Sequence, residues 1–544
     1  MNIRRAVRRL ESGNQSGYPT LLCESRSPLW TIESAMEASL QLGKVQNLRK
    51  ACKTLHRVLV PAGEVFSFWM QLGRATRRSG YVLGRELRQG CLIPTIGGGL
   101  CQLSNALYDL ALRCDCEIVE RHPHTSIVPG SAAEHGRDAT VFWNYVDFRF
   151  RPRQDILITC VLSRNELVVC FWGKQPFQII QSSGVKTQSG SGPETCTECD
   201  KESCFRHINP ARHAHRSKTA FLIEECWPEF QEFVAGVKTE NDVLYLPFHS
   251  RIWTNPRYAW QQNGFQEIHA ASLPTALSVV QERLGMHKRI APIEVQLRRS
   301  KELASFYAAR LSFLADRLYV AQSLLPELWK NGDLGGRSFS VLLSRFPMAL
   351  LHQKLDALVA KYPDRKSFSE FRAPEWMVQA ESEALAEAGS IITPHSALAR
   401  LYPDKAIRLK WSMLPHELRI DNGRPKKTIV FPGPSFARKG AFELREAVRG
   451  LDCRILTLAQ AAESKTFWKG FPVSPAGSRW LEQASVVVQP AFIENNPRPL
   501  LRALNADVPV IATPECGVDG FSSLTLVPEG DPTALANALR SALI

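Results

Sequence analysis

The chain has 544 residues, more than a single hydrophobic core can organise, so we expect about two to four domains. Its 44% hydrophobic and 22% charged residues are typical of globular proteins, and no stretch approaches the roughly 18 consecutive apolar residues of a membrane-spanning helix. The formal net charge of +14 indicates anionic partners such as nucleotide-sugars or an anionic membrane surface, but Lys and Arg are spread along the chain, so we expect no nucleic acid partner.

The N-terminal segment and the cysteines bear on location. Residues 1–17 are basic and lack an apolar stretch, which does not fit a secretory signal. Fourteen cysteines in a chain of this length do not resemble a small secreted disulfide scaffold. We therefore expect a cytoplasmic protein with reduced thiols. Its basic charge also allows peripheral contact with the inner face of the membrane.

The first 175 residues are expected to form a mixed α+β domain. Residues 30–60 carry apolar stripes at helical spacing, and a second helical pattern follows the glycines at 97–99. Residues 139–150 and 155–172 have the composition of two strands joined by an Arg-Pro-Arg turn.

Cys101 is the candidate nucleophile of this domain. It follows three consecutive glycines at the predicted start of a helix, where the helix dipole favours a thiolate. Either His122 or His124 could serve as its base, and Asp138 could orient the imidazole. Backbone amides near residues 98–100 could hold an oxyanion. The alternative is that Cys101 is a small buried residue at a tight crossing and that the histidines lie on surface strands.

A linker with a cysteine cluster is expected over residues 176–217. Residues 181–195 are rich in Ser and Gly, the composition of a flexible connection. The linker also holds a closely spaced set of three thiols and an imidazole: Cys196, Cys199, Cys204 and His207. Such a set fits one tetrahedral zinc ion, and three thiolates could instead hold an iron–sulfur cluster. The third interpretation is a loop of free thiols.

Several motifs over roughly residues 43–152 occur in one order: Pro-x-Gly-Glu-x-Phe-Ser-Phe, Gly-Gly-Gly-x-Cys-Gln, Glu-Arg-His-x-His and Gly-x-Asp-Ala-Thr. This order resembles the VanW domain. The family is named for an accessory protein of glycopeptide-resistance clusters, and some members resemble cysteine peptidoglycan transpeptidases. The resemblance implies a cell-envelope role, with acyl transfer by Cys101 on stem peptides as one activity. The lack of a visible export signal weighs against wall chemistry.

From residue 218 onward, short apolar runs alternate with helical stretches, which predicts parallel sheets in doubly wound, Rossmann-like α/β domains. The stretches EIHAAS, FPGPSFARKG, ASVVVQPAFIE and LLRALNADVPVIAT follow one another here. Together they resemble the family 4 group of retaining glycosyltransferases, which implies a GT-B fold. We place its N-terminal half at residues 218–420 and its C-terminal, donor-binding half at residues 421–544.

The resemblance implies a nucleotide-sugar site. His269 would lie near the donor cleft, and Glu494 would accept hydrogen bonds from hydroxyl groups of the donor. Arg438 and Lys439 would face the diphosphate, because a diphosphate leaving group needs cations where negative charge develops. The alternative for this basic pair is a solvated helix start.

Two positions depart from the glycosyltransferase pattern. Arg502 stands where the family has a second glutamate, and Pro434 stands at or near the place of an expected arginine. We expect transfer of a sugar from a nucleotide-sugar to a cell-surface glycan or its precursor, the acceptor being a glycan, lipid-linked or peptidoglycan-type molecule. The alternatives are cysteine-dependent acyl transfer by the VanW domain and a non-catalytic module that binds a nucleotide or glycan.

Overall fold

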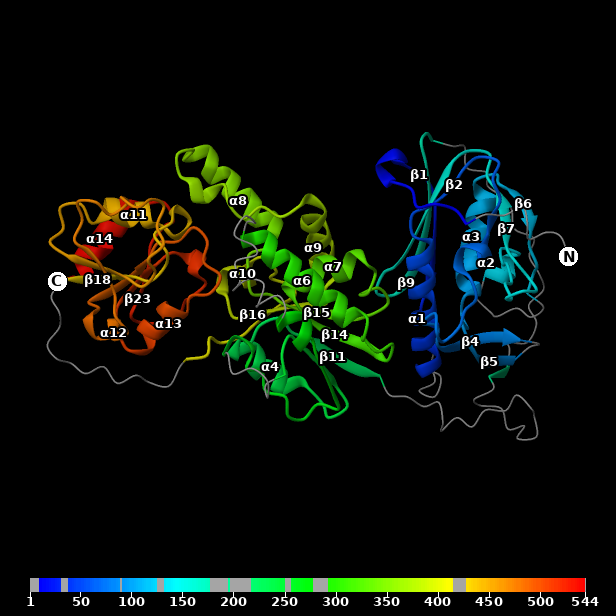
Figure 1. Ribbon diagram of the computed structural model, residues 1–544, viewed down its shortest axis with the longest axis horizontal. Helices are drawn as coiled ribbons and strands as arrows, with labels where there is room; N and C mark the ends of the chain where they lie inside the picture. Colours follow the sequence, from blue (N-terminus) through cyan, green and yellow to red (C-terminus); the bar gives the residue numbers. More distant parts are fainter. Residues whose placement is uncertain are drawn as a thin grey trace. The chain divides into compact units, whose positions relative to one another are not determined.

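The computed structural model describes residues 9–30, 38–88, 91–124, 132–176, 194–195, 217–249, 256–276, 292–413 and 427–543 (Figure 1). The chain divides into two compact units. Unit 1 comprises Met1–Ala220, Arg310–Leu318 and Leu328–Ser338. Unit 2 comprises Phe221–Ala309, Tyr319–Glu327 and Phe339–Ile544. Among the described residues, no helix is both long enough and apolar enough to cross a bilayer.

Unit 1 is built on an antiparallel sheet. Its strands lie in the order β1 (Thr20–Pro28), β9 (Glu166–Gly173), β8 (Ile156–Leu162) and β2 (Val58–Val60). Two three-stranded sheets accompany it: β10 (Glu194–Thr195), β5 (Cys91–Ile96) and β4 (Leu83–Arg88), and β3 (Phe66–Ser67), β7 (Arg149–Arg151) and β6 (Glu117–Glu120). The helices are α1 (Ala38–Leu55), α2 (Phe68–Leu72) and α3 (Cys101–Arg113).

Helix α3 packs on the sheet through one apolar stripe. Leu103, Leu107, Leu110 and Ala111 recur at helical spacing and are fully buried in the core of unit 1. The strand predicted at 139–150 is wrong over most of its length, since only β7 forms there. Asn144 adopts a left-handed backbone with φ of 68°, which turns the chain tightly and pairs Phe142 with Val146.

The α/β part of the chain contains two sheets. The first has seven strands in the order β13 (Glu267–Ala270), β12 (Val243–Leu246), β11 (Lys218–Leu222), β14 (Ala315–Ala321), β15 (Ser338–Leu342), β16 (Ser390–Thr393) and β17 (Ala406–Arg408). The second has six parallel strands: β20 (Val473–Pro475), β19 (Arg454–Thr457), β18 (Thr428–Phe431), β21 (Val486–Gln489), β22 (Val510–Ala512) and β23 (Leu524–Leu526).

Helices alternate with these strands, as the sequence predicts. Those of the first half are α4 (Pro228–Val237), α6 (Pro292–Ala308), α7 (Leu325–Lys330), α8 (Met348–Lys361), α9 (Glu375–Glu387) and α10 (Ser396–Arg400). Those of the second half are α11 (Ala441–Ala447), α12 (Trp480–Gln483), α13 (Arg498–Asn505) and α14 (Pro532–Ala542). The predicted fold class, a small α+β domain followed by two doubly wound halves, is confirmed.

Both faces of the second sheet are covered. Ile429 and Phe431 of β18 pack in the core with α11 and α14, whereas Val430 packs in the core on the opposite face, with α12 and α13 (Figure 1). A strand buried on both faces must be apolar at every position, which explains its unbroken hydrophobic run. The carboxyl ends of such strands form an edge where loops can collect polar groups.

Candidate functional sites

Glycines set the loop that leads to Cys101. A Cβ at Gly98 would lie 2.4 Å from the Gly84 carbonyl oxygen, so this close crossing of two backbones requires glycine. The buried Asn47 of α1 fixes the same crossing. Its Nδ2 donates to the carbonyl oxygens of Val82, at 3.0 Å, and Gly98, at 2.9 Å, while its Oδ1 accepts from the Val82 amide at 2.9 Å. The chain therefore enters α3 at a defined point.

The structure brings Cys101, His124 and Asp138 together. Asp138 Oδ2 lies 2.7 Å from His124 Nδ1 and accepts from the His124 amide at 2.6 Å. Its other oxygen accepts from Arg121 Nη2 at 2.8 Å. The thiol of Cys101 interacts with the same ring and raises its pKa. The order is thiol, imidazole, carboxylate, the arrangement that activates a cysteine nucleophile.

The charges of this triad reinforce one another. Burial opposes protonation of His124, but its hydrogen bonds to Asp138 and Cys101 outweigh burial and raise its pKa to about 9. Burial likewise opposes ionisation of Asp138, yet the bonds from His124 and the charge of Arg121 lower the pKa of this carboxyl. At neutral pH the site holds an imidazolium between a carboxylate and a sulfur atom, so a thiolate there would be stabilised.

Two polar side chains of α3 hold the Asp138 segment against the helix. Ser104 Oγ donates to the Ala139 carbonyl at 2.6 Å, and Asn105 Oδ1 accepts from the Ala139 amide at 2.8 Å. His122 differs from His124: its side chain is 53% exposed, and its Nε2 lies 3.6 Å from Glu120. Of the two predicted bases, the structure places His124 at the thiol.

Amides at the helix start are the candidate oxyanion donors. The Gly98 amide already donates to the Thr95 carbonyl at 3.1 Å. Within the described part of the chain, the amides of Leu100 and Cys101 meet no acceptor. These two N–H groups could therefore hold a developing oxyanion beside the sulfur.

The predicted metal ligands lie outside the described residues: Cys196, Cys199, Cys204 and His207. Among the described residues, no group of three or more His, Cys, Asp or Glu side chains could hold a metal ion.

In unit 2, Lys439 and Glu494 meet at the carboxyl edge of the second sheet. Lys439 follows β18, and its Nζ donates to Glu494 Oε2 at 3.0 Å and to the Ile493 carbonyl at 3.1 Å. Gln489, the last residue of β21, donates to the same carboxylate oxygen, and the Asn496 amide donates to Oε1 at 3.0 Å. A cation and a carboxylate are thus fixed side by side, with 16% and 10% of their side chains exposed.

Arg438, the neighbour of Lys439, is held in a different way. Its Nη1 donates to Glu370 at 3.0 Å, and its guanidinium lies over the rings of Phe371, at 4.4 Å, and Phe436, at 4.6 Å. Burial lowers the pKa of Arg438 although Glu370 opposes this effect. A phosphate group would have to compete with Glu370 for this side chain.

His269 and a second histidine occupy different places. His269 lies on β13, where its ring packs against Tyr245 and its Nε2 is 3.6 Å from Glu267. His395, which sequence reasoning missed, is 1% exposed, and its Nε2 donates to the Glu494 carbonyl at 2.8 Å. Its Nδ1 accepts from the Leu398 amide at the start of α10, which fixes the tautomer. His395 therefore supports Glu494 from the first half of unit 2.

The two departures from the glycosyltransferase pattern occupy ordinary structural positions. The Arg502 guanidinium lies over the Trp480 ring at 5.6 Å, and the Pro434 carbonyl accepts from the Phe436 amide at 2.7 Å.

A buried ion pair was not foreseen either. Arg498 Nη1 and Nη2 donate to the two carboxylate oxygens of Glu229 at 2.7 and 2.6 Å. The guanidinium lies between the rings of Trp227 and Trp411, at 5.5 and 5.4 Å, and the Glu229 side chain is fully buried. No motif signals such a pair, because its members are 269 residues apart.

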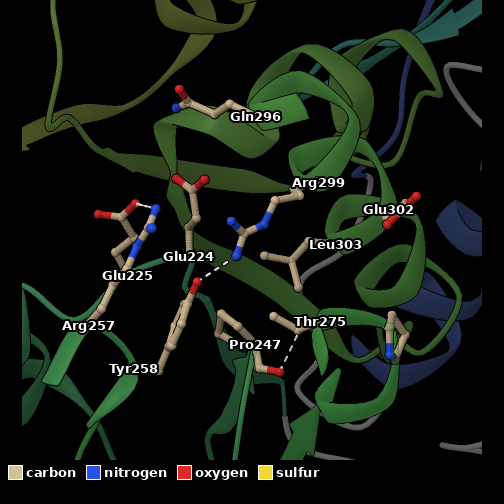
Figure 2. A pocket seen from close by; sticks show the side chains of 11 residues that line it. Glu224, Glu225, Pro247, Arg257, Tyr258, Thr275, Gln296, Arg299, Glu302 and Leu303 are labelled. Carbon is tan, nitrogen blue, oxygen red and sulfur yellow. Dashed lines mark hydrogen bonds and ion pairs between the residues drawn. The ribbon is translucent and has the colours of Figure 1, made fainter. Parts of the chain in front are cut away.

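A charged pocket opens beside the ends of β11 and β12 in unit 2 (Figure 2). Figure 2 shows Arg299 of α6 reaching Tyr258, whose hydroxyl oxygen accepts at 2.7 Å, and Arg257 paired with Glu225. Glu224 projects into the same space. Paired guanidinium and carboxylate groups can exchange hydrogen bonds with the hydroxyl groups of a sugar.

Comparison with known families locates two domains. The model for "VanW like protein" matches residues 43–172, and the model for "Glycosyl transferases group 1" matches residues 438–544. The VanW resemblance is thereby confirmed, and over residues 438–544 so is the resemblance to a glycosyltransferase.

Two curated proteins are similar to the first domain. One is the vancomycin B-type resistance protein VanW of Enterococcus faecalis, 34% identical over 140 residues, which are 25% of this chain and 51% of that protein. The other is the uncharacterized protein YoaR of Bacillus subtilis, 39% identical over 128 residues, which are 23% of this chain and 42% of that protein. The chain thus spans about half the length of the curated relatives it matches.

Among solved structures, the sucrose-phosphate synthase of Thermosynechococcus elongatus is similar at 15% identity and a TM-score of 0.40. The match covers 60% of this chain and 90% of the synthase. Similarity at this level does not bear on substrate or activity.

Proposed function

Because the chain carries a VanW domain at residues 43–172 and a group 1 glycosyltransferase domain at residues 438–544, we propose that unit 2 transfers a sugar from a nucleotide-sugar to a cell-surface glycan or its precursor. The observation that carries this proposal is the joint placement of Lys439 and Glu494 at the carboxyl edge of the second sheet. Ligands of open α/β sheets bind at this edge.

Lys439 and Glu494 would have complementary roles in such a transfer reaction. Lys439 can stabilise the negative charge that grows on the diphosphate as the sugar leaves, and the Glu494 carboxylate can accept hydrogen bonds from ribose or sugar hydroxyl groups. In the absence of donor the two groups pair with each other. Arg502 replaces a second carboxylate, which weakens the contacts to the donor. The competing outcome is that the site binds the donor without transferring its sugar.

Calorimetric titration with a panel of nucleosides, nucleoside diphosphates and nucleotide-sugars tests the proposal. Lys439→Ala should weaken diphosphate binding by about 1.5–3 kcal/mol, roughly 10- to 150-fold, and nucleoside binding far less, since one charge-assisted contact is lost. Lys427→Ala is the matched control, because Lys427 immediately precedes β18, the strand that Lys439 follows, but pairs with Asp452 at the surface.

The outcomes separate the alternatives. Release of nucleoside diphosphate from a nucleotide-sugar by the wild type, lost in Lys439→Ala, supports transfer. Tight binding without release identifies a binding module instead. If folded wild type binds no nucleotide at millimolar concentration, the donor site does not exist.

A second candidate function is cysteine-dependent acyl transfer by the VanW domain, which the Cys101–His124–Asp138 geometry favours. The Cys101 thiolate would attack the carbonyl carbon of a peptidoglycan-type stem peptide, and imidazolium His124 would give its proton to the departing amine. An acceptor amine would then attack the thioester, return a proton to His124 and release the new amide.

Mass spectrometry after incubation with stem peptides tests this function. The wild type should gain an acyl group on Cys101, which hydroxylamine removes, and Cys101→Ala should gain none. Cys226→Ser is the control, since Cys226 is another partly exposed thiol, located in unit 2. If Cys101 reacts no faster with small alkylating reagents than the buried Cys160, it is a packing residue and this function fails.

A further inference from the structure

Two buried thiols of unit 1 touch each other away from the Cys101 site. Cys23 lies on β1, Cys114 caps the carboxyl end of α3, and each is 3% exposed. Their sulfur atoms are 2.7 Å apart, although the residues are 91 positions apart in sequence. We infer that Cys23 and Cys114 form a redox couple that closes to a disulfide when a low-molecular-weight disulfide is present. This inference goes beyond the proposed functions and does not depend on them.

The geometry requires little movement to form the bond. A disulfide has a sulfur–sulfur distance of about 2.05 Å, so the two atoms need to approach by only about 0.7 Å. Cys23 lies within β1 and Cys114 caps α3, and both are packed in one core, so their approach needs no long-range rearrangement.

Neighbouring contacts already hold α3 on β1 along its length. At the start of the helix, Gln102 Nε2 donates to Ser27 Oγ at 2.8 Å. At its end, Arg113 Nη1 donates to the Glu24 carbonyl at 2.6 Å. A disulfide between Cys23 and Cys114 would add a covalent link between the same two elements. It would therefore fix α3, the helix whose first residue is Cys101.

The reduced pair is chemically quiet while the protein stays folded. The hydrogen bond to Cys114 and burial raise the pKa of the Cys23 thiol far above its ordinary value, although Arg113 opposes this effect. Thiolates are the species that attack disulfides, so exchange proceeds when α3 and β1 separate locally. The couple therefore equilibrates slowly with its surroundings.

The reaction balances as two exchange steps with oxidised glutathione. One protein thiolate attacks a glutathione sulfur, which forms a mixed disulfide and releases one glutathione thiolate. The second protein thiolate attacks the protein-bound sulfur of this mixed disulfide and releases the second glutathione. The two protons from Cys23 and Cys114 end on the two released glutathione thiols.

Equilibration of the full chain in glutathione buffers, from reduced to oxidised, tests the inference. Remaining thiols are blocked with N-ethylmaleimide after denaturation, and a non-reducing digest is mapped by mass spectrometry. The oxidised sample should contain a peptide that links Cys23 to Cys114 and lacks two hydrogen atoms. Its thermal midpoint should rise by about 5–15 °C relative to the reduced sample, because the link closes a long loop of the unfolded chain.

Two variants make the result specific. Cys114→Ser should abolish both the linked peptide and the thermal shift. Cys116→Ser should keep both, since Cys116 is also buried but its sulfur contacts the Cys114 carbonyl at 3.8 Å and not a thiol. Cys52 also raises the pKa of the buried Cys160 thiol, so a map that links these two cysteines while Cys23 and Cys114 stay blocked overturns the inference. A map with no link after equilibration of the wild type overturns it equally.

Discussion

Replacement of Asp138 by asparagine would remove one charge from the triad while keeping the shape of the side chain. Asp138 is 3% exposed and accepts hydrogen bonds from Arg121 and from both the ring and the amide of His124. The oxygen of the asparagine side chain can still accept on one side, but its amide nitrogen cannot accept from the donors that face the other carboxylate oxygen. His124 would lose its anionic partner and should remain neutral over most of the physiological pH range.

The structure sets the magnitude. The pKa of His124 is raised from 6.5 to about 9, which corresponds to about 3 kcal/mol of preference for the charged ring. Because the His124 side chain is 13% exposed, solvent screens little of this preference. Loss of most of this preference for the charged ring should slow alkylation of Cys101 about 10- to 100-fold near pH 6.5, where the imidazolium stabilises the thiolate.

The same shift predicts how stability changes with pH. A group whose folded pKa is raised stabilises the protein fully below its unfolded value, here about 6.5. This contribution is lost as pH rises through about 9. Wild type should therefore lose more stability between these pH values than Asp138→Asn does.

Rates of iodoacetamide labelling, followed residue by residue with mass spectrometry, measure the first effect, and denaturant titrations across the pH range measure the second. Asp155→Asn is the control, since Asp155 pairs with Lys174 near the surface of the same unit. Equal labelling rates at Cys101 in wild type and Asp138→Asn would refute the triad argument. So would an NMR titration in which His124 changes charge at its ordinary pKa.

Three further changes test other parts of the structure. Arg498→Met should destabilise unit 2 by about 3 kcal/mol in denaturant titrations, because it leaves the buried Glu229 carboxylate without a charged partner, with only the Ser412 amide still donating to it. Burial raises the pKa of Glu381 to about 7, so wild type should lose about 3 kcal/mol relative to Glu381→Gln as pH rises from about 4.5 to about 8, measured by the same titrations. Elemental analysis of purified protein should give about one zinc per chain, lost on Cys199→Ser with Cys204→Ser.

Each of these predictions has a control or a contrary outcome. Arg449→Met removes an exposed surface pair with Glu446 and should change stability by less than about 0.5 kcal/mol; an equal effect of both arginine variants contradicts the buried-pair argument. Glu387→Gln, an exposed change on the same helix as Glu381, should leave the pH profile of wild type unaltered. Colourless, metal-free wild type purified without chelator excludes both zinc and iron–sulfur.

Burial on two faces made the fold class predictable. A run such as Ile429, Val430 and Phe431 is apolar at every position because its neighbours pack in two different cores, and such runs between helical stretches indicate a parallel sheet. Local composition failed at 139–150, where aromatic and β-branched residues favour a strand but Asn144 makes a left-handed turn.

The candidate site residues could be predicted only where they belong to a recognisable sequence motif. Cys101, His124 and Asp138 stand in short motifs of the VanW domain, but the sequence could not say which histidine meets the thiol. His395 and Glu494 are 99 residues apart and follow strands of different sheets, so their contact follows from tertiary packing alone. No periodicity or spacing records such a contact.

The Asn47 amide has a chemical consequence of its own. Deamidation would convert it to aspartate, a change of one nitrogen to one oxygen, and would set a carboxylate oxygen against the Val82 and Gly98 carbonyls that the amide now serves. The lone pairs of the carboxylate would face the lone pairs of the two carbonyl oxygens, and this repulsion would act at the crossing from which α3 begins. Ageing at this one position could therefore displace Cys101 while every group of the triad remains chemically intact.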